Sequence, residues 1–142
     1  MASTSKPTVI GVDVGAANTV VAYIAKGVDI VLDQSSKRKT PSCVVFGNEN
    51  RLLGTEGDSV IKSNLKNSAT NFRSLIGLKF GTETHKAEKP FALGQLVETE
   101  KGNVGFKINY CKDVSVIREK AIKAYYSSFQ KKIRVIWLIY LW

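Results

Sequence analysis

The sequence contains little cysteine and histidine: two cysteines, Cys43 and Cys111, and one histidine, His85, in 142 residues. The cysteines stand far apart and no second histidine completes a four-ligand set, so a structural zinc site is not expected. The opening residues, MASTSKPT, lack the apolar segment of about 7 to 15 residues that marks a secretory signal. We therefore expect reduced thiols, packed as small apolar side chains, in a cytoplasmic protein, with the nucleus as a second location.

The sequence also lacks an apolar run long enough to cross a membrane. The most apolar stretch, VIWLIYLW at 135–142, is far shorter than the roughly 20 residues that a spanning helix needs. No membrane partner is expected. Because this run closes the sequence without a polar cap or a turn signal, we expect it to be a buried strand of an incomplete domain.

The composition is that of an ordinary soluble domain, with 44% hydrophobic and 23% charged residues and neither internal repeats nor low-complexity tracts. The net charge of +9 is uneven, because residues 1–111 carry 14 basic and 10 acidic side chains and residues 112–142 carry 7 and 2. Binding to nucleic acid would depend on this basic tail, and it is the least favoured of the functions considered below.

The first half of the sequence predicts strands. Two runs rich in β-branched residues, 9–14 and 19–24, flank the turn Gly-Ala-Ala-Asn and indicate a hairpin. Further strands are expected at 29–32, at 42–46 and, as a short strand, from Arg51.

Apolar residues spaced by three and four then predict two consecutive helices, 58–65 and 69–76. Gly57 is expected just before the first helix, and Gly77 at the left-handed end of the second. Residues 81–89 are interpreted as a polar loop.

A second hairpin is expected to pair residues 92–98 with 104–110 around an EKGN turn. Residues 114–129 have apolar side chains at helical spacing and predict a helix, which is followed by a truncated strand from Ile133.

The stretch VIGVDVGAANTVVAYI sets one carboxylate, Asp13, between a buried strand and a turn of small residues. The turn residues Gly15, Ala16, Ala17 and Asn18 leave access open, so their backbone N–H groups can point together at an anion. Asp13 can hold a hydrated Mg²⁺ against the same phosphates, because Mg²⁺ keeps several waters and takes one or two carboxylates. Small residues suit any tight hairpin, so the residues alone leave a purely structural turn as the alternative.

Four segments, in this order and with these separations, resemble a known family: IGVDVGAANTVVA, KTPSCVVF, NRLLGTEGDSVIKSN and NFRSLIGLKF. They look like the amino-terminal lobe of the heat-shock protein 70 chaperones, from Thr8 to Phe80 and more loosely to Tyr110. The segments GVDIVLDQSSKRKTPS and LIGLKF look most similar to the hundred-and-ten-kilodalton branch. Members of that branch act largely as nucleotide-exchange partners of the chaperones.

The resemblance implies an α/β fold, the actin-like ATPase or ribonuclease H-like lobe, in which a mixed sheet with β-hairpins is flanked by helices. Residues 1–142 would form part of one lobe of the nucleotide-binding domain, with a clear match over 8–110 and a weakly matching or aberrant tail over 111–142. ATP or ADP and Mg²⁺ are the implied cofactors. The implied partners are chaperones of the family and unfolded client proteins.

The resemblance also assigns roles to residues. Phosphate contacts fall to residues 15–18, and the carboxylate that binds Mg²⁺ through water is Asp13. Arg73 stands where the family has a lysine that reaches the terminal phosphate and positions the attacking water, so it is the candidate for catalysis and phosphate binding. Alone, an arginine on an amphipathic helix is typical of a solvated surface residue. Arginine binds phosphate through its planar fork but cannot give up a proton, and alanines replace the family's threonines at 16 and 17. We therefore expect nucleotide binding to be kept better than hydrolysis.

Four functions remain open: an ATP-binding chaperone, a nucleotide-exchange co-chaperone with little ATPase activity, an actin-like sugar kinase, and nucleic-acid binding by the tail. The motifs KTPSCVVF and NFRSLIGLKF speak against the kinase. The chain alone is expected to have essentially no turnover, because two phosphate loops must meet across a cleft to form the site. It is also expected to expose apolar surface and to aggregate.

Overall fold

The computed structural model describes residues 9–24, 26–110 and 113–117. The strands are β1 (Ile10–Val14), β2 (Asn18–Ile24), β3 (Val28–Ile30), β4 (Thr40–Pro41), β5 (Cys43–Phe46), β6 (Arg51–Leu53), β7 (Ser68–Thr70), β8 (Gln95–Glu98), β9 (Val104–Tyr110) and β10 (Asp113–Ile117). The helices are α1 (Gly54–Val60), α2 (Phe72–Leu75) and α3 (Glu83–Glu88), with 3₁₀ turns η1 (Ile61–Ser63), η2 (Leu65–Asn67) and η3 (Lys89–Phe91).

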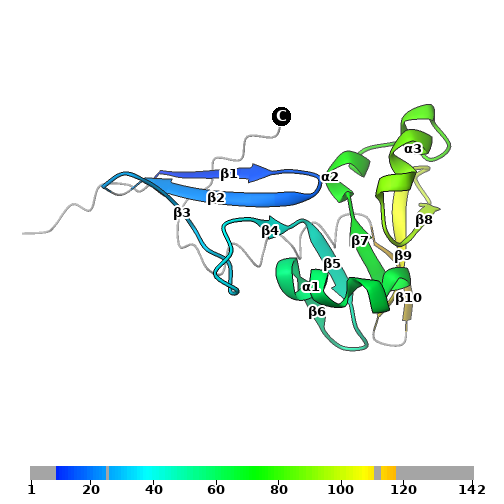
Figure 1. Cartoon of the computed structure of the whole chain (residues 1–142). Coiled ribbons are helices and arrows are strands. Elements are labelled where there is room, and N and C mark those ends of the chain that lie inside the picture. The colour runs from blue at the N-terminus through cyan, green and yellow to red at the C-terminus, as the bar shows by residue number, and fades with distance from the viewer. Residues whose placement is uncertain (1–8, 25, 111–112, 118–142) are drawn as a thin grey trace, which may run out of the picture.

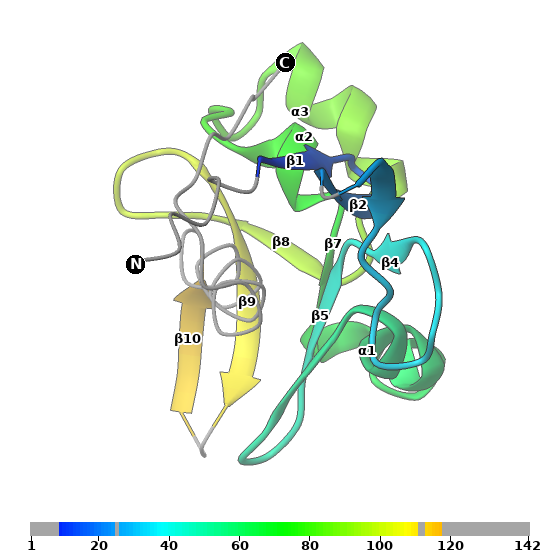
Figure 2. The ribbon, with the colours of Figure 1, turned by 90° about the vertical axis from the view of Figure 1, so that its left-hand side faces the viewer.

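The described strands form three sheets. Their orders are β1-β2-β3 with β4 also on β2, β6-β5-β7, and β10-β9-β8. Each of these pairings is antiparallel. Figure 1 shows the β1–β2 hairpin extending away from the other two sheets with its turn directed at α2, and Figure 2 gives the same arrangement seen from the hairpin side. Sheets and short helices are consistent with an α/β lobe, but the expected mixed sheet is not seen, because every pairing among the described strands is antiparallel.

The core is built around β5, whose four residues are all buried. Successive strand residues point to opposite faces, so β5 contributes to two clusters. Val44 and Phe46 pack in the larger cluster, and Cys43 and Val45 pack with Ile61 in the smaller one. The larger cluster joins β5 to β7, α2 and β9 through Ala69, Phe72, Leu75, Val104, Phe106 and Ile108.

The first hairpin is confirmed. β1 pairs with β2 in a register that runs from Ile10 opposite Tyr23 to Val14 opposite Thr19. Val14 and Thr19 are buried on one face, whereas Asp13 is exposed on the other, as the alternation of a strand requires. The third strand spans Val28–Ile30, slightly earlier than expected, and the strands predicted near 42–46 and from Arg51 are β5 and β6.

The prediction for the helix at 58–65 was wrong at both ends. α1 begins at Gly54 and gives way after Val60 to η1 and η2. Gly57 is not a helix boundary. It is a buried contact, because a Cβ there would lie 2.8 Å from the Leu52 carbonyl oxygen.

The helix predicted at 69–76 was also wrong in its first part. Residues 68–70 form β7, in which Ala69 lies opposite Val44 of β5. The helix is limited to the single turn α2, because pairing with the buried strand outweighs the local helical spacing. Gly77 follows in the left-handed conformation, with φ 76°, as predicted.

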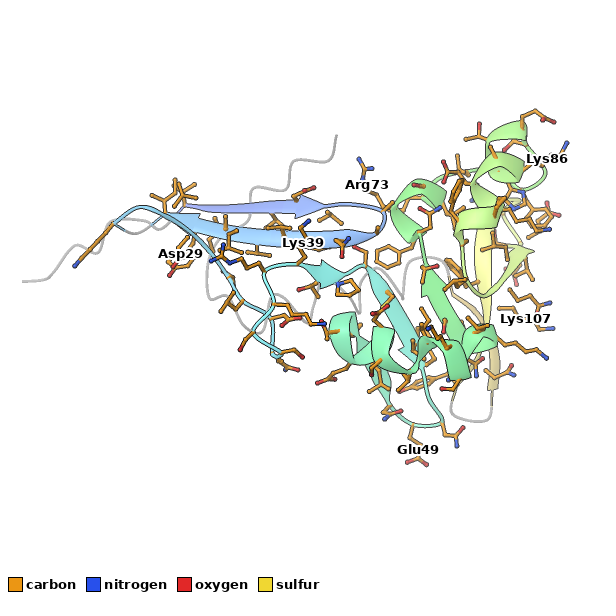
Figure 3. All side chains as sticks on the ribbon, in the orientation of Figure 1. Asp29, Lys39, Glu49, Arg73, Lys86 and Lys107 are labelled. Carbon is orange, nitrogen blue, oxygen red and sulfur yellow. The ribbon has the colours of Figure 1, made fainter. Side chains whose placement is uncertain are left out.

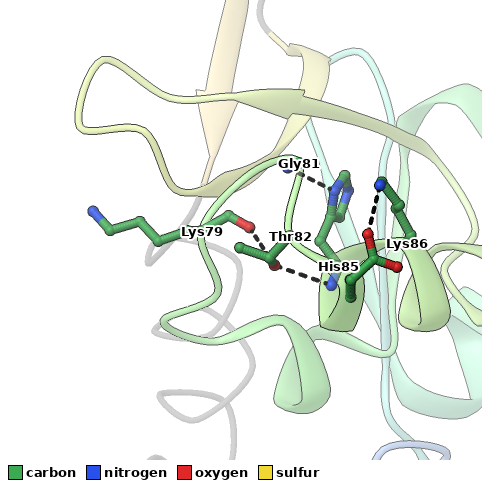
Figure 4. A network of polar contacts seen from close by, with 6 residues as sticks. Lys79, Gly81, Thr82, His85 and Lys86 are labelled. Carbon is green, nitrogen blue, oxygen red and sulfur yellow. Dashed lines mark hydrogen bonds and ion pairs between the residues drawn. The ribbon is translucent and has the colours of Figure 1, made fainter.

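Residues 81–89, expected to be a polar loop, instead contain α3. Thr82 caps this helix: its Oγ1 accepts a hydrogen bond from the His85 N–H at 3.3 Å and donates one to the Lys79 carbonyl at 2.9 Å. The buried His85 ring accepts a further hydrogen bond at Nδ1 from Gly81 N–H, and Lys86 pairs with Glu83 one turn away (Figure 4). The Thr82 cap and the Lys86–Glu83 pair thus stabilise this helix, which has almost no apolar face.

The second hairpin is confirmed as β8 paired with β9, with Glu98 opposite Val104. It starts at Gln95, later than expected, because Gly94 has φ 102°, which is not the backbone of a strand. The helix predicted from residue 114 was wrong at its start, since Asp113–Ile117 form β10 along β9. The rest of that helix, the strand from Ile133 and most of the basic tail lie outside the described residues. Among the helices that the structure describes, none is long and apolar enough to cross a membrane.

Two glycines with positive φ make a matched test of packing at β8. Gly94 has φ 102°, and a Cβ there would overlap the Ser68 carbonyl oxygen, whereas a Cβ on Gly77 would meet no atom within 4 Å. We expect Gly77→Ala to lower the free energy of unfolding by about 1 to 2 kcal/mol, the cost of left-handed backbone for alanine. Gly94→Ala should cost clearly more, because backbone must move. Urea unfolding followed by circular dichroism measures both, and equal losses would contradict the contact at Ser68.

Candidate phosphate-binding site

The turn between β1 and β2 is tight, and its side chains are small. Gly15 N–H donates a hydrogen bond to the Asn18 carbonyl at 2.9 Å. None of the residues 15–18 has a positive φ, so alanines fit at 16 and 17 without strain. Gly15 is required for another reason, because a Cβ there would lie 2.7 Å from the Asn18 carbonyl oxygen.

Ser42 holds this turn, and sequence analysis missed it. Its side chain is buried between the hairpin and β5, with the residue only 3% exposed. The Ser42 N–H donates to the Ala17 carbonyl at 2.8 Å, and the Ser42 Oγ donates to the Gly15 carbonyl at 2.9 Å. The Thr19 hydroxyl lies 3.1 Å from the same Oγ. Both carbonyls are therefore engaged on one side of the turn.

The amides of the turn are left available. Within the described residues, no hydrogen bond has the N–H of Ala16 or of Ala17 as its donor. Ala17 and Asn18 are exposed. Unused N–H groups on a turn without bulky side chains suit an anion such as a phosphate.

Asp13 lies two residues before the turn, opposite Val20 in the register and on the exposed face of the hairpin. In the part of the chain that the structure describes, no group of three or more acidic, cysteine or histidine side chains could hold a metal. Asp13 therefore belongs to no such larger group, and Mg²⁺, which keeps several waters, needs only one or two carboxylates.

Arg73 lies at the end of the molecule where the turn of the first hairpin lies. It lies half-buried on α2, and Figure 3 shows it beside the end of the hairpin that carries the turn. α2 begins after Asn71, whose φ of 51° is left-handed and whose buried amide donates to a Glu88 carboxylate oxygen at 2.9 Å. The position of Arg73 therefore depends on α3 as well as on its own helix.

A basic loop leads into β4. Lys37, Arg38 and Lys39 are exposed, and Lys39 lies beneath the hairpin in Figure 3. Asp33 braces this loop: one carboxylate oxygen accepts the N–H groups of Ser35 and Lys37 at 2.8 Å each, and the other accepts the Thr55 hydroxyl.

The same contacts set the acidity of Asp33. Burial raises its pKa, but the hydrogen bonds from Thr55 and from the two N–H groups, with the charge of Lys37, together bring the pKa below 3.8. The carboxylate is the form that holds the loop.

Cys43 is a free, buried thiol. Burial raises its pKa to about 11, aided by the charge of Asp58, and its thiol donates a hydrogen bond to the Gly54 carbonyl at 3.3 Å. A thiol this weakly acidic is an unreactive part of the core, as the sequence predicted.

The chain is similar in sequence to known proteins. The family model described as Hsp70 protein matches residues 9–128. The chain belongs to the heat-shock protein 70 family. It is 38% identical to a heat shock protein homolog of Saccharomyces cerevisiae over 104 residues, which cover 72% of this chain and 15% of that protein. It is 34% identical to heat shock protein 88 of Dictyostelium discoideum over 115 residues, 80% of this chain and 15% of that protein.

Heat shock protein 110 of Caenorhabditis elegans is 29% identical over 104 residues, 72% of this chain and 13% of that protein. The chain thus spans about a seventh of the length of these relatives. The family implies an actin-like, nucleotide-binding ATPase fold, and the turn with Asp13 lies at the start of the matching region.

The hydrogen bonds to the Asp33 carboxylate predict that the stability of the fold depends on pH. Because its folded pKa is lowered, the carboxylate stabilises the fold above about pH 3.8 and loses this contribution as the pH falls through the folded value. We expect Asp33→Asn to be less stable than the wild type at pH 6, with a difference that shrinks toward pH 3. Urea unfolding at several pH values measures this. Glu100→Gln, outside this loop, is the control, and a difference for Asp33→Asn that did not shrink would contradict the brace.

Proposed function

We propose that residues 9–110 form the part of a heat-shock protein 70 family nucleotide-binding lobe that contacts the phosphates of ATP or ADP. One observation carries the proposal: the carbonyls of Gly15 and Ala17 are held by Ser42, while the N–H groups of Ala16 and Ala17 donate no hydrogen bond within the described residues. Residues 15–18 are then the phosphate-binding turn. Family membership supports a nucleotide as the anion.

Asp13 is proposed to bind Mg²⁺ through water, since it is an exposed carboxylate two residues from the turn. A bound Mg²⁺ would neutralise phosphate charge. Arg73 is proposed to contact the nucleotide through its guanidinium, which matches phosphate oxygens in pairs. Arginine cannot take part in proton transfer, and alanines occupy 16 and 17. We therefore propose that the site keeps nucleotide binding better than it keeps ATP hydrolysis.

For the whole protein we propose a chaperone or co-chaperone of this family, acting on unfolded proteins together with other family chaperones, in the cytoplasm. The relatives are named as heat shock proteins, among them heat shock proteins 88 and 110. The alanine pair and Arg73 favour the co-chaperone, which would bind nucleotide and promote exchange on a partner. The family match supports either chaperone function over a sugar kinase.

The nucleotide site predicts a Mg²⁺-dependent titration. In a ¹⁵N-labelled sample of the chain, Mg·ATP should shift the amide signals of Ala16 and Ala17 with millimolar affinity, because only one side of the cleft is present. Asp13→Ala should weaken binding in Mg²⁺ about tenfold, since a charge-assisted contact contributes about 1.5 kcal/mol or more. Glu100→Ala removes a carboxylate elsewhere and should change nothing. Equal affinities of wild type and Asp13→Ala in Mg²⁺ would remove the metal role.

The co-chaperone function predicts accelerated exchange. In a chimera, residues 9–110 replace the matching segment of the yeast relative, which completes the domain. We expect this chimera to speed the release of labelled ADP from a family chaperone while turning over little ATP itself. The unmodified yeast relative is the reference. A chimera that binds nucleotide but leaves ADP release unchanged would favour the chaperone over the exchange partner.

A further inference from the structure

Ser42 is in contact with both ends of the turn, through its side chain and through its backbone. Its Oγ holds the Gly15 carbonyl and its N–H holds the Ala17 carbonyl. We propose that Ser42 is a positioning residue for phosphate binding, which keeps the two carbonyls away from the anion and so turns the amides toward it. This inference rests on the proposed function of the turn.

The geometry of the peptide bond gives the reason. In a planar trans peptide the C=O and the following N–H point in opposite directions. Holding the Gly15 carbonyl toward Ser42 therefore directs the Ala16 N–H away from Ser42. Holding the Ala17 carbonyl does the same for the Asn18 N–H. One residue thus sets the direction of two amides.

Ser42 can do this because of where it stands in the chain. It directly precedes β5, whose four residues are buried, and it is itself 3% exposed. β4, just before it, pairs with Asn18 and Thr19 of β2. The serine is therefore fixed by the core on one side and by the hairpin on the other, and its hydroxyl has little freedom to leave the turn. An exposed serine at this place would trade these bonds for water.

If the Gly15 carbonyl rotated toward the phosphate, its oxygen would repel the anion, and the Ala16 N–H would point away from it. The expected effect of losing the hydroxyl is a rise in the dissociation constant of about threefold to tenfold, the range that a single hydrogen bond supports. Because Ser42→Ala keeps its own N–H, the Ala17 carbonyl stays held. The Ala16 amide should therefore be affected more than the Asn18 amide.

The test is a titration of the ¹⁵N-labelled chain with Mg·pyrophosphate, which removes base and sugar contacts. We expect wild type to show shifts at the amides of the turn, and Ser42→Ala to bind more weakly with the larger loss at Ala16. Ser42→Thr keeps the hydroxyl and should restore the response. Ser68→Ala is the matched control, because Ser68 is fully buried and its Oγ donates to the Asn64 carbonyl at 2.7 Å, away from the turn.

The outcomes separate the two proposals. A wild-type response that Ser42→Ala does not weaken, or weakens no more than Ser68→Ala, overturns the role of Ser42 and leaves the phosphate-binding turn standing. A wild type without any response at the turn overturns both. If Ser42→Ala does not fold, hydrogen exchange in the wild type decides: slow exchange at the Ser42 amide with fast exchange at Ala16 supports the proposal, and a protected Ala16 amide overturns it.

Discussion

Complete burial of β5 is the constraint on which the rest of the fold depends. A strand buried on both faces must find hydrogen-bond partners on both edges and apolar partners on both sides. β6 and β7 supply the edges, and two separate clusters supply the faces. Val44 and Phe46 pack with residues of α2 and β9, while Cys43 and Val45 pack with Ile61 of η1. Elements distant in sequence are arranged around these four residues.

The candidate site is an extension of the same constraint. The residue before β5 reaches the turn of the first hairpin, and the two residues before that pair with β2. The hairpin therefore does not rely on its own turn residues for orientation, which allows these residues to be as small as glycine and alanine. A turn without side chains can bind an anion only if something else keeps it in shape, and here the buried strand does so.

The elements that could be predicted from sequence are those with local signals. β-branched runs around a small-residue turn indicated the first hairpin, and strand-like runs around an EKGN turn indicated β8 and β9. The turn and Asp13 were singled out because small residues next to a carboxylate suit phosphate and Mg²⁺, and that role stays a prediction. β7 could not be found, because residues 68–70 become a strand only by pairing with β5.

Two further features escaped prediction for different reasons. α3 lacks an apolar stripe, and its one signal was Thr82 before an acidic first turn. Ser42 carries no signal at all, since its role arises from a contact between residues 27 positions apart. The strands that pair with their neighbours in sequence were therefore predictable, and the contacts that give the turn its orientation were not.

The bond between Asn71 and Glu88 has a practical consequence for anyone who trims or redesigns this domain. Residues 81–89 look dispensable, being mostly polar, short and largely at the surface. Their helix nevertheless ends in the carboxylate that accepts the amide at the start of α2. Shortening this surface segment, or replacing it with a flexible linker, would remove that hydrogen bond from the start of α2. The packing of Phe72 and Leu75 would then have to hold the helix that carries the Arg73 guanidinium.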